Sequence, residues 1–338
     1  MKSTLDFHPK FLASLASYSK EKFTKDLMAG IIVGIVALPL AIAFGIASGV
    51  SPEKGLITAI IGGFIVSFLG GNSVQIGGPT GAFIVIVYGI IQAYGLEGLA
   101  IATFMAGLIL VLMGCFRLGT IIKFIPYPIV VGFTSGIALT IFATQIKDLL
   151  GLSMDSVPAD FISKWVAYFQ HIETTNFWSL GIGMLSILII AYPPRISNKI
   201  PGSLMAIILM TVLVYVLERL WGIEGIETIG DRFNISNEVP EPQALNINME
   251  TINQLLSPAF TIAVLGAIES LLSATVADGV TGDKTNSNTE LIAQGAANIV
   301  VPFFGGIPVT GAIARTMNNI NNGGRTPIAG IIHAVVLL

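Results

Sequence analysis

The sequence predicts an all-α polytopic membrane protein, built as an inverted repeat with one broken helix in each half. Three observations support this prediction. Of the 338 residues, 53% are hydrophobic and only 11% are charged, whereas soluble domains carry about a quarter charged residues. Apolar runs of about 20 residues recur along the chain, as expected of membrane-spanning helices. Two similar Gly/Pro-rich motifs that contain Thr-Gly-Ala, Gly77–Ala82 and Gly305–Ala312, interrupt these runs.

The composition also excludes several functions. The net charge of −3 gives no electrostatic footprint for nucleic acid. Cys115 is the single cysteine, so an internal disulfide and a cysteine-based metal site are both excluded. No nucleophile–base pair, phosphate-binding loop or metal cluster stands out, so we expect a protein that is not an enzyme and that holds no cofactor and no metal.

The expected elements follow from the apolar runs and the breakers between them. Residues 1–26 carry five lysines and predict either a cytoplasmic interfacial helix or a solvated tail. In the first half we expect spans at 27–48 and 56–71, an extended piece at 72–79, a half-helix at 80–94, and spans at 98–115, 128–147, 175–193 and 201–217. After an acidic outer loop at 218–255 come spans at 257–277 and 288–302, an extended piece at 303–310, a half-helix at 311–322 and an apolar run from 327.

The charges set the expected orientation. With a cytoplasmic N-terminus, eleven Lys and Arg residues fall inside and five fall outside, which satisfies the positive-inside rule. Seven spans in the first half reverse the topology of the second half, as in many secondary transporters of the inner membrane. A constant offset of 230 residues aligns Thr80 with Thr310 and Pro39 with Glu269. Because this offset sets Leu338 opposite position 108, we expect the sequence to stop after segment 11 and to lack about three spans.

The two Gly/Pro-rich motifs, Gly77–Ala82 and Gly305–Ala312, break the helices and predict an anion site; they are called the breakers below. A non-helical segment survives in the bilayer only where it is buried in protein or lines a wet cavity. The half-helices beginning at Thr80–Gly81 and Gly311–Ala312 would point their N-termini at the membrane centre from opposite sides, each with free N–H groups and about half a positive charge. Thr80 and Thr310 add hydroxyl donors. The alternative is that both pieces are ordinary loops between helices.

Four other residues could contribute to this site. Glu269 is mid-span and predicts a proton-exchanging carboxyl, or else a structural carboxyl bonded to backbone or to Arg315. Ser273, one turn further on, is a neighbour of the site or a packing residue. Arg315 attracts the anion or balances Glu269; alternatively it snorkels to the interface. Pro39 interrupts the first span: either its kink opens the span beside the site, with Phe44 covering the substrate, or it is a plain packing kink.

These residues resemble the sulfate permease (SulP) family of anion transporters. The resemblance is carried by Leu38–Phe44, Gly78–Gly81, Ala267–Leu272 and, most strongly, Phe304–Thr316 with Asn318–Asn319 and Gly323–Pro327. It implies fourteen segments in two inverted sevens, with a substrate that sits between segments 3 and 10 and moves with a core domain, elevator fashion. The core would comprise 27–127 (segments 1–4) and 256–338 (segments 8–11), and 128–255 would be the first part of a gate domain (segments 5–7). Many relatives also have segments 12–14 and a cytoplasmic STAS domain, which this sequence does not contain. The resemblance further implies a homodimer, because family members often dimerise.

The resemblance also assigns roles. Glu269 matches the acidic residue of segment 8, Thr80 and Phe44 line the site, Gly311 and Ala312 offer backbone donors, and Arg315 matches the arginine of segment 10. Two departures matter: Leu40 stands where many eukaryotic relatives have glutamine, and Glu269 and Ile313 replace the Asp and the hydroxyl that bicarbonate-transporting relatives favour for sodium. We therefore expect proton coupling over sodium coupling.

The resulting hypothesis is a proton-coupled symporter of a small anion of the sulfate, bicarbonate or C4-dicarboxylate class. An uncoupled anion channel or an exchanger of the same architecture is a second hypothesis. A nucleobase symporter is a third, because it shares the seven-plus-seven plan, although Arg315 and the backbone donors argue against it.

Overall fold

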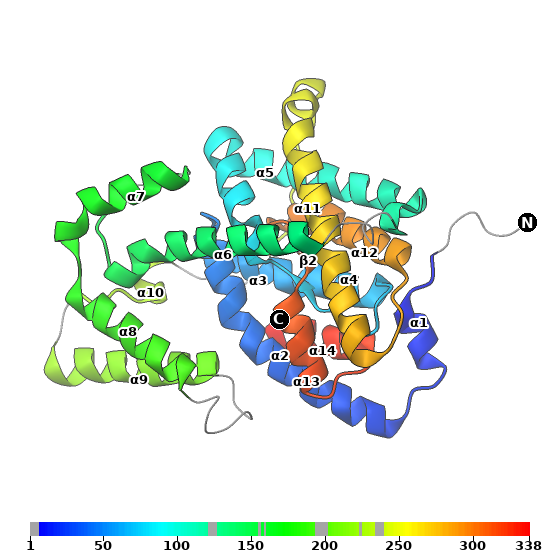
Figure 1. The fold of residues 1–338 in the computed structure, drawn as a ribbon, viewed down its shortest axis with the longest axis horizontal. Helices are drawn as coiled ribbons and strands as arrows, with labels where there is room; N and C mark the ends of the chain where they lie inside the picture. The colour runs from blue at the N-terminus through cyan, green and yellow to red at the C-terminus, as the bar shows by residue number, and fades with distance from the viewer. Residues whose placement is uncertain are drawn as a thin grey trace, which may run out of the picture. The chain divides into compact units, whose positions relative to one another are not determined.

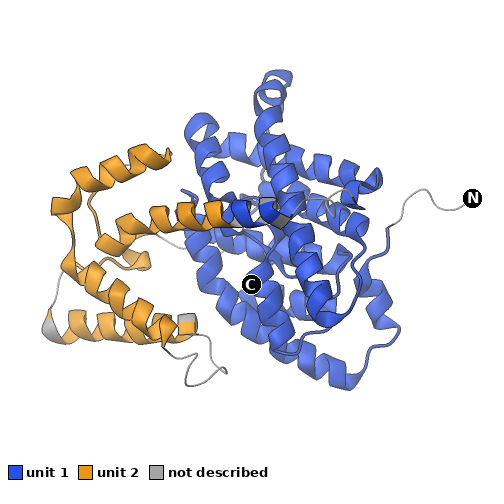
Figure 2. Cartoon of the chain, in the orientation of Figure 1, with its two compact units in different colours: residues 1–134, 236–338 blue, residues 135–235 orange. Residues whose placement is uncertain are grey.

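The computed structural model describes residues 7–120, 127–154, 157–158, 160–192, 202–222, 225–233 and 240–338, and helices dominate it (Figure 1). The chain divides into two compact units, which Figure 2 colours separately. Unit 1 comprises residues 1–134 and 236–338, and unit 2 comprises residues 135–235. The predicted assignment of core and gate domains to stretches of the chain remains a prediction.

Unit 1 contains both broken helices. In its first half the elements are α1 (Lys10–Leu15), α2 (Lys20–Ala47), α3 (Pro52–Ile57), the π-helix η1 (Thr58–Gly62), α4 (Gly63–Leu69), strand β1 (Gly77–Gly78), the 3-10 turn η2 (Gly81–Phe83) and α5 (Ile84–Cys115). In its second half they are α11 (Met249–Thr281), α12 (Ser287–Val300), the 3-10 turn η6 (Val301–Phe304), strand β2 (Thr310–Gly311), α13 (Ile313–Asn321) and α14 (Pro327–Leu337).

Local sequence explains where these helices begin and break. Asn248 caps α11 by accepting a hydrogen bond from the N–H of Thr251, and Thr326 caps α14 ahead of Pro327 at its first position. Within α5, Gly95 has φ 70° and ψ −174°, a backbone conformation that only glycine adopts without strain. The apolar stretch Gly81–Cys115 is therefore two successive helices, as the sequence predicts, and not one long span.

The predicted spans correspond to observed helices. By length and composition alone, four described helical stretches could cross a membrane: Lys20–Ala47, Pro52–Leu69, Gly81–Cys115 (taken across the break at Gly95) and Met249–Thr281. The shorter apolar helices Phe177–Ala191 and Pro327–Leu337 accompany them. The first span starts seven residues earlier than expected, at Lys20 instead of 27. The expected outer loop at 218–255 is also shorter, because α9 continues to Trp221 and α11 begins at Met249. Residues 223–224 and 234–239 of this loop lie outside the described residues.

The halves of unit 1 interlock through glycines. Helix α12 packs on α5, and a Cβ on Gly107 would lie 2.7 Å from the carbonyl oxygen of Gly295. Helix α14 packs on α2, where a Cβ on Gly30 would lie 2.6 Å from the carbonyl oxygen of Ala329. Around these contacts, α5, α11 and α12 enclose a core that includes Phe83, with 1% of its surface exposed. Such close backbone approach joins helices of the first half to helices of the second half.

Unit 2 is a separate helical body. Its elements are the greater part of α6 (Tyr127–Leu150), α7 (Phe161–Gln170), the 3-10 turn η4 (Ile172–Thr174), α8 (Phe177–Ala191), α9 (Gly202–Trp221) and α10 (Ile229–Arg232). Helices α8 and α9 pack together around a small core of Val214, Leu217 and Ile226. Asn176 caps α8 by accepting hydrogen bonds from two N–H groups in its first turn.

The strand pair joins the two broken segments. Gly77 faces Gly311 and Gly78 faces Thr310 in an antiparallel pair. The N–H of Ala312 donates to the carbonyl oxygen of Ile76 (2.9 Å) next to this pair. The expected offset of 230 residues between the two halves is compatible with this register and stays a prediction.

Candidate functional site

Two unwound segments, 70–80 and 305–312, meet in unit 1 at the β1–β2 pair. Buried side chains satisfy the backbone groups that a helix would otherwise pair. The hydroxyl of Thr316 accepts from the N–H of Ile76 (3.1 Å), and the hydroxyl of Thr58 accepts from the N–H of Ile307 (2.8 Å). This is the condition under which irregular backbone is tolerated at membrane depth. The breakers are thus a built part of the protein interior and not loose connections between helices.

Asn298 on α12 supports the second segment most completely. Its side-chain oxygen accepts from the N–H of Val309 (2.9 Å), and its side-chain nitrogen donates to the carbonyl oxygens of Val309 and Gln294 (both 2.8 Å). Asn298 is 1% exposed. The side-chain amide of Asn298 therefore pairs with both backbone groups of Val309, as a neighbouring strand would.

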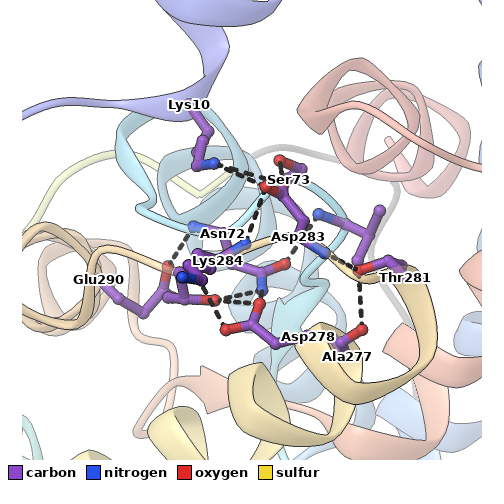
Figure 3. Close-up of polar contacts among 11 residues, drawn as sticks. Lys10, Asn72, Ser73, Ala277, Asp278, Thr281, Asp283, Lys284 and Glu290 are labelled. Atoms are coloured by element: carbon purple, nitrogen blue, oxygen red, sulfur yellow. Dashed lines mark hydrogen bonds and ion pairs between the residues drawn. The ribbon is translucent and has the colours of Figure 1, made fainter.

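A polar cluster holds the start of the first segment (Figure 3). Glu290 on α12 accepts from the N–H groups of Gly71 (2.9 Å) and Asn72 (3.2 Å). The side chain of Asn72 reaches Thr285 (2.7 Å) in the loop between α11 and α12. Neither Glu290 nor Asn72 is more than 5% exposed. The loop and α12 together fix the point where the chain leaves α4.

The N-terminal segment joins the same cluster. The backbone N–H of Lys10 donates to the carbonyl oxygen of Gly70 (2.9 Å), and its ammonium pairs with Asp283 (3.1 Å), to which Ser73 also donates (Figure 3). Burial alone would raise the pKa of Asp283, but the bonds from Ser73, Lys284 N–H and Lys10 hold that pKa below its ordinary value. Residues from the N-terminal segment, the first unwound segment and the α11–α12 loop are therefore tied together.

The first half-helix begins beside a carboxylate. Thr80 is 7% exposed, and its hydroxyl donates to Oε2 of Glu269 on α11 (2.9 Å). The N–H of Phe83 donates to the carbonyl oxygen of Thr80 (3.3 Å) and opens the 3-10 turn. The N–H groups of Gly81 and Ala82 precede that bond, at the positive end of the helix. The structure thus brings together Thr80, Gly81 and Glu269.

The second half-helix begins differently from the prediction. The N–H of Gly311 donates to the hydroxyl of Ser270 (3.1 Å), and the N–H of Ala312 donates to the carbonyl oxygen of Ile76 (2.9 Å). The expectation that these two N–H groups are the open donors is therefore wrong in this structure. The first intrahelical bond runs from Thr316 N–H to Ala312, so the end donors of the helix belong to residues 313–315.

The hydroxyl of Thr310 is also used inside the protein. It contacts the hydroxyl of Ser270 (2.6 Å) and donates to the carbonyl oxygen of Gly266 (3.2 Å), and Thr310 is 0% exposed. The prediction of a second hydroxyl open to an anion is therefore wrong here. The two threonines thus make different contacts, Thr80 with Glu269 and Thr310 with Ser270 and Gly266.

Arg315 is buried directly behind strand β1. It is 2% exposed, which excludes the alternative that it snorkels to an interface. A Cβ on Gly78 would lie 2.0 Å from its Nη1, so the absence of a side chain at Gly78 makes room for the guanidinium. Neither Nη1 nor Nη2 has a hydrogen-bond partner among the described residues. A buried guanidinium without partners favours an anion or water nearby.

Two other predicted residues lie further from the helix starts. The hydroxyl of Ser273 points at Thr316 (3.4 Å) and is buried, so it supports α13 from α11. Phe44 is half-buried near the end of α2, and its cover of a substrate stays a prediction. In the part of the chain that the structure describes, no group of three or more His, Cys, Asp or Glu side chains is placed to hold a metal ion.

Sequence reasoning missed the residues that support the site. Thr58, Asn298 and Ser270 all pair with backbone groups of the unwound segments. Each is a polar residue inside an apolar span, and this position is the feature of the sequence that could have identified them. Glu290 likewise binds two backbone N–H groups of the first unwound segment.

Comparisons with known proteins agree with this arrangement. Residues 23–338 match the model of the sulfate permease family. The chain is 46% identical over 330 residues to the protein named "Putative sulfate transporter YvdB" of Bacillus subtilis (strain 168), covering 97% of this chain and 62% of that one. It is 32% identical over 328 residues to "Bicarbonate transporter BicA" of Picosynechococcus sp. (strain ATCC 27264 / PCC 7002 / PR-6), covering 93% and 56%. The chain thus spans about three-fifths of the length of these curated relatives.

Solved structures show the same fold. The transmembrane domain of a cyanobacterial bicarbonate transporter, BicA, matches with a TM-score of 0.85 and 30% identity, over 95% of this chain and 82% of that one. The structure of SLC26A9 matches with a TM-score of 0.83 at 19% identity, over 96% of this chain and 55% of that one, which shows fold alone. The predicted fold class, an all-α polytopic transporter fold with a broken helix in each half, is confirmed.

Proposed function

Because the chain belongs to the sulfate permease family, we propose that it is a secondary transporter that carries a small anion across the inner membrane. The anion would belong to the sulfate, bicarbonate or C4-dicarboxylate class, in keeping with relatives named for sulfate and for bicarbonate. The proposed topology is multi-pass with a cytoplasmic N-terminus. Unit 1 would be the core that carries the anion, elevator fashion, and a homodimer is the proposed assembly.

The observation that carries the proposal is that two half-helices follow one strand pair, and that the first of them starts beside the carboxylate of Glu269. Helix N-termini attract anions through free N–H groups and the helix dipole. The N–H groups of Gly81 and Ala82 lie at one such end, and those of residues 313–315 lie at the other. Arg315 adds a buried positive charge behind strand β1. The anion would sit between these ends, with Phe44 as its cover.

Glu269 supplies the proposed coupling. Its carboxylate lies mid-helix in α11 and accepts a hydrogen bond from Thr80, the residue that opens the first half-helix. Protonation would remove a negative charge next to the anion, so proton and anion would bind together. No hydrogen bond or ion pair joins Glu269 to Arg315 in the described residues. Arg315 therefore stays available to attract the anion.

The test is uptake of labelled sulfate, bicarbonate and fumarate into proteoliposomes under an imposed pH gradient, with and without sodium. We expect accumulation that follows the proton gradient and is independent of sodium, and we expect Glu269→Gln to lose the dependence on the gradient. Glu97→Gln is the matched control, since Glu97 is exposed and bonded to Asn246 (3.1 Å). Uptake by Glu269→Gln that still follows the gradient would refute the coupling role. Voltage-driven current that persists in this variant would instead favour a channel or exchanger.

A further inference from the structure

Two consecutive residues of α11 reach the starts of both half-helices. Glu269 accepts from the hydroxyl of Thr80 at the start of the first half-helix (2.9 Å). The next residue, Ser270, accepts from the N–H of Gly311 directly before the second half-helix (3.1 Å) and contacts the hydroxyl of Thr310 (2.6 Å). One turn of one unbroken helix therefore spaces the two ends between which the proposed anion sits.

The bonds of Ser270 form one consistent chain. The N–H of Gly311 donates to the Ser270 hydroxyl, which donates to the Thr310 hydroxyl, which donates to the carbonyl oxygen of Gly266. Each hydroxyl in this chain donates once and accepts once, so every proton is used. Ser270 and Thr310 are both 0% exposed. In such a buried chain, removal of one hydroxyl leaves two neighbours unpaired.

The strand beside Ser270 is held from a second element as well. A Cβ on Gly311 would lie 1.8 Å from the side-chain nitrogen of Gln75, so Gln75 packs directly against this residue. Ser270 binds the backbone N–H of the same glycine. The position of Gly311 is therefore set between α11 and the first unwound segment.

We propose that Ser270 is a positioning residue that determines which anions the site accepts. It touches no anion in this proposal and acts through Gly311 and Thr310. It fixes the second half-helix start relative to Glu269 and the first, and so sets the gap that the anion must fill. It also occupies the N–H of Gly311, which would otherwise be a further open donor at that end. Selectivity among small anions depends on such spacing and on the number of donors.

This inference rests on the proposed function and has its own readout. Unlabelled sulfate, bicarbonate, formate and fumarate compete with the best-transported labelled anion in proteoliposomes, which gives an inhibition constant for each. We expect Ser270→Ala to change the ratio between the constants of a small and a large anion by about 3- to 10-fold, the effect of one buried hydrogen bond. A merely structural role would lower the maximum uptake and leave these ratios unchanged.

Two further variants make the outcome decisive. Ser270→Cys keeps the volume and a weak acceptor, so its ratios are expected between those of the unmodified protein and Ser270→Ala. Thr275→Ala removes a hydroxyl on the same helix whose partner among the described residues is the carbonyl oxygen of Leu271 (2.7 Å), and it should change no ratio. Equal changes for all anions, or none in both Ser270 variants, would overturn the proposal. Absence of anion uptake by the unmodified protein would instead refute the proposed function.

Discussion

Replacement of Glu290 tests whether the first unwound segment depends on hydrogen-bond acceptors or on negative charge. Its carboxylate is 0% exposed. Oε2 accepts from the backbone N–H groups of Gly71 (2.9 Å) and Asn72 (3.2 Å), and Oε1 accepts from the side-chain nitrogens of Gln75 (3.0 Å) and Gln294 (2.8 Å). Four donors therefore converge on one buried group.

Glu290→Gln and Glu290→Ala should differ strongly. The side-chain oxygens of Gln75 and Gln294 have no partner among the described residues. In Glu290→Gln these two amides can turn over and accept from the new NH₂ group, while the new oxygen keeps both backbone donors. This variant loses only the extra strength that a charged acceptor gives to these hydrogen bonds, which lowers the free energy of unfolding by about 1–2 kcal/mol. In Glu290→Ala the two backbone N–H groups lose their acceptor and a cavity opens, at about 4–6 kcal/mol.

The assay is thermal unfolding of the detergent-solubilised protein. For a chain of this size each kcal/mol lowers the midpoint by roughly 2 °C. Glu290→Gln should then lose about 2–4 °C and Glu290→Ala about 8–12 °C. Glu97→Gln and Glu97→Ala are the matched pair on an exposed glutamate and should be indistinguishable. Equal losses for the two Glu290 variants would show that the charge, and not the set of acceptors, stabilises the segment.

Three other predictions use the same protein preparations. Gly95→Ala should lower the free energy of unfolding by about 1–3 kcal/mol through backbone strain alone, because an added Cβ would meet nothing within 4 Å. Gly89 has equally open surroundings but lies in regular helix, so Gly89→Ala should be neutral or slightly stabilising in the same thermal assay. Gly78→Ala should reduce anion uptake per folded protein at least about tenfold, because its methyl would lie 2.0 Å from Nη1 of Arg315; normal uptake would show that Arg315 need not lie there. Thr80→Val should raise the KM for the anion about 3- to 10-fold through the lost hydroxyl, whereas Thr80→Ser should not; equal values would exclude that hydroxyl from the site.

The positions of the helices were open to sequence reasoning because the length of an apolar run and the placement of Gly and Pro are local properties. The break between the two helices of α5, at Gly95, falls where the apolar pattern is interrupted. The pairing of Thr80 with Glu269 is more distant, yet both residues stood out by chemistry: a hydroxyl at a breaker and a carboxyl in mid-span. The sequence therefore identified Thr80 and Glu269 as candidate site residues, although it did not predict the hydrogen bond between them.

The supporting residues could not be found in this way. Thr58, Asn298 and Ser270 belong to common residue types, and their importance comes from the backbone groups opposite them. Those partners lie 249, 11 and 41 residues away in the chain. Which backbone group faces which side chain depends on tertiary packing, and one sequence contains no measure of it.

The two Thr-Gly-Ala motifs have the same sequence but make different contacts, and this difference has a chemical consequence. Thr80 directly precedes the 3-10 turn that opens its half-helix, and its hydroxyl bonds to the carboxylate of Glu269. Thr310 lies within strand β2, and its hydroxyl bonds to Ser270. The two halves share one fold but present different donors at their meeting point. An anion held there would meet a hydroxyl from one side and peptide N–H groups from both, so the pseudo-symmetric fold has an asymmetric site.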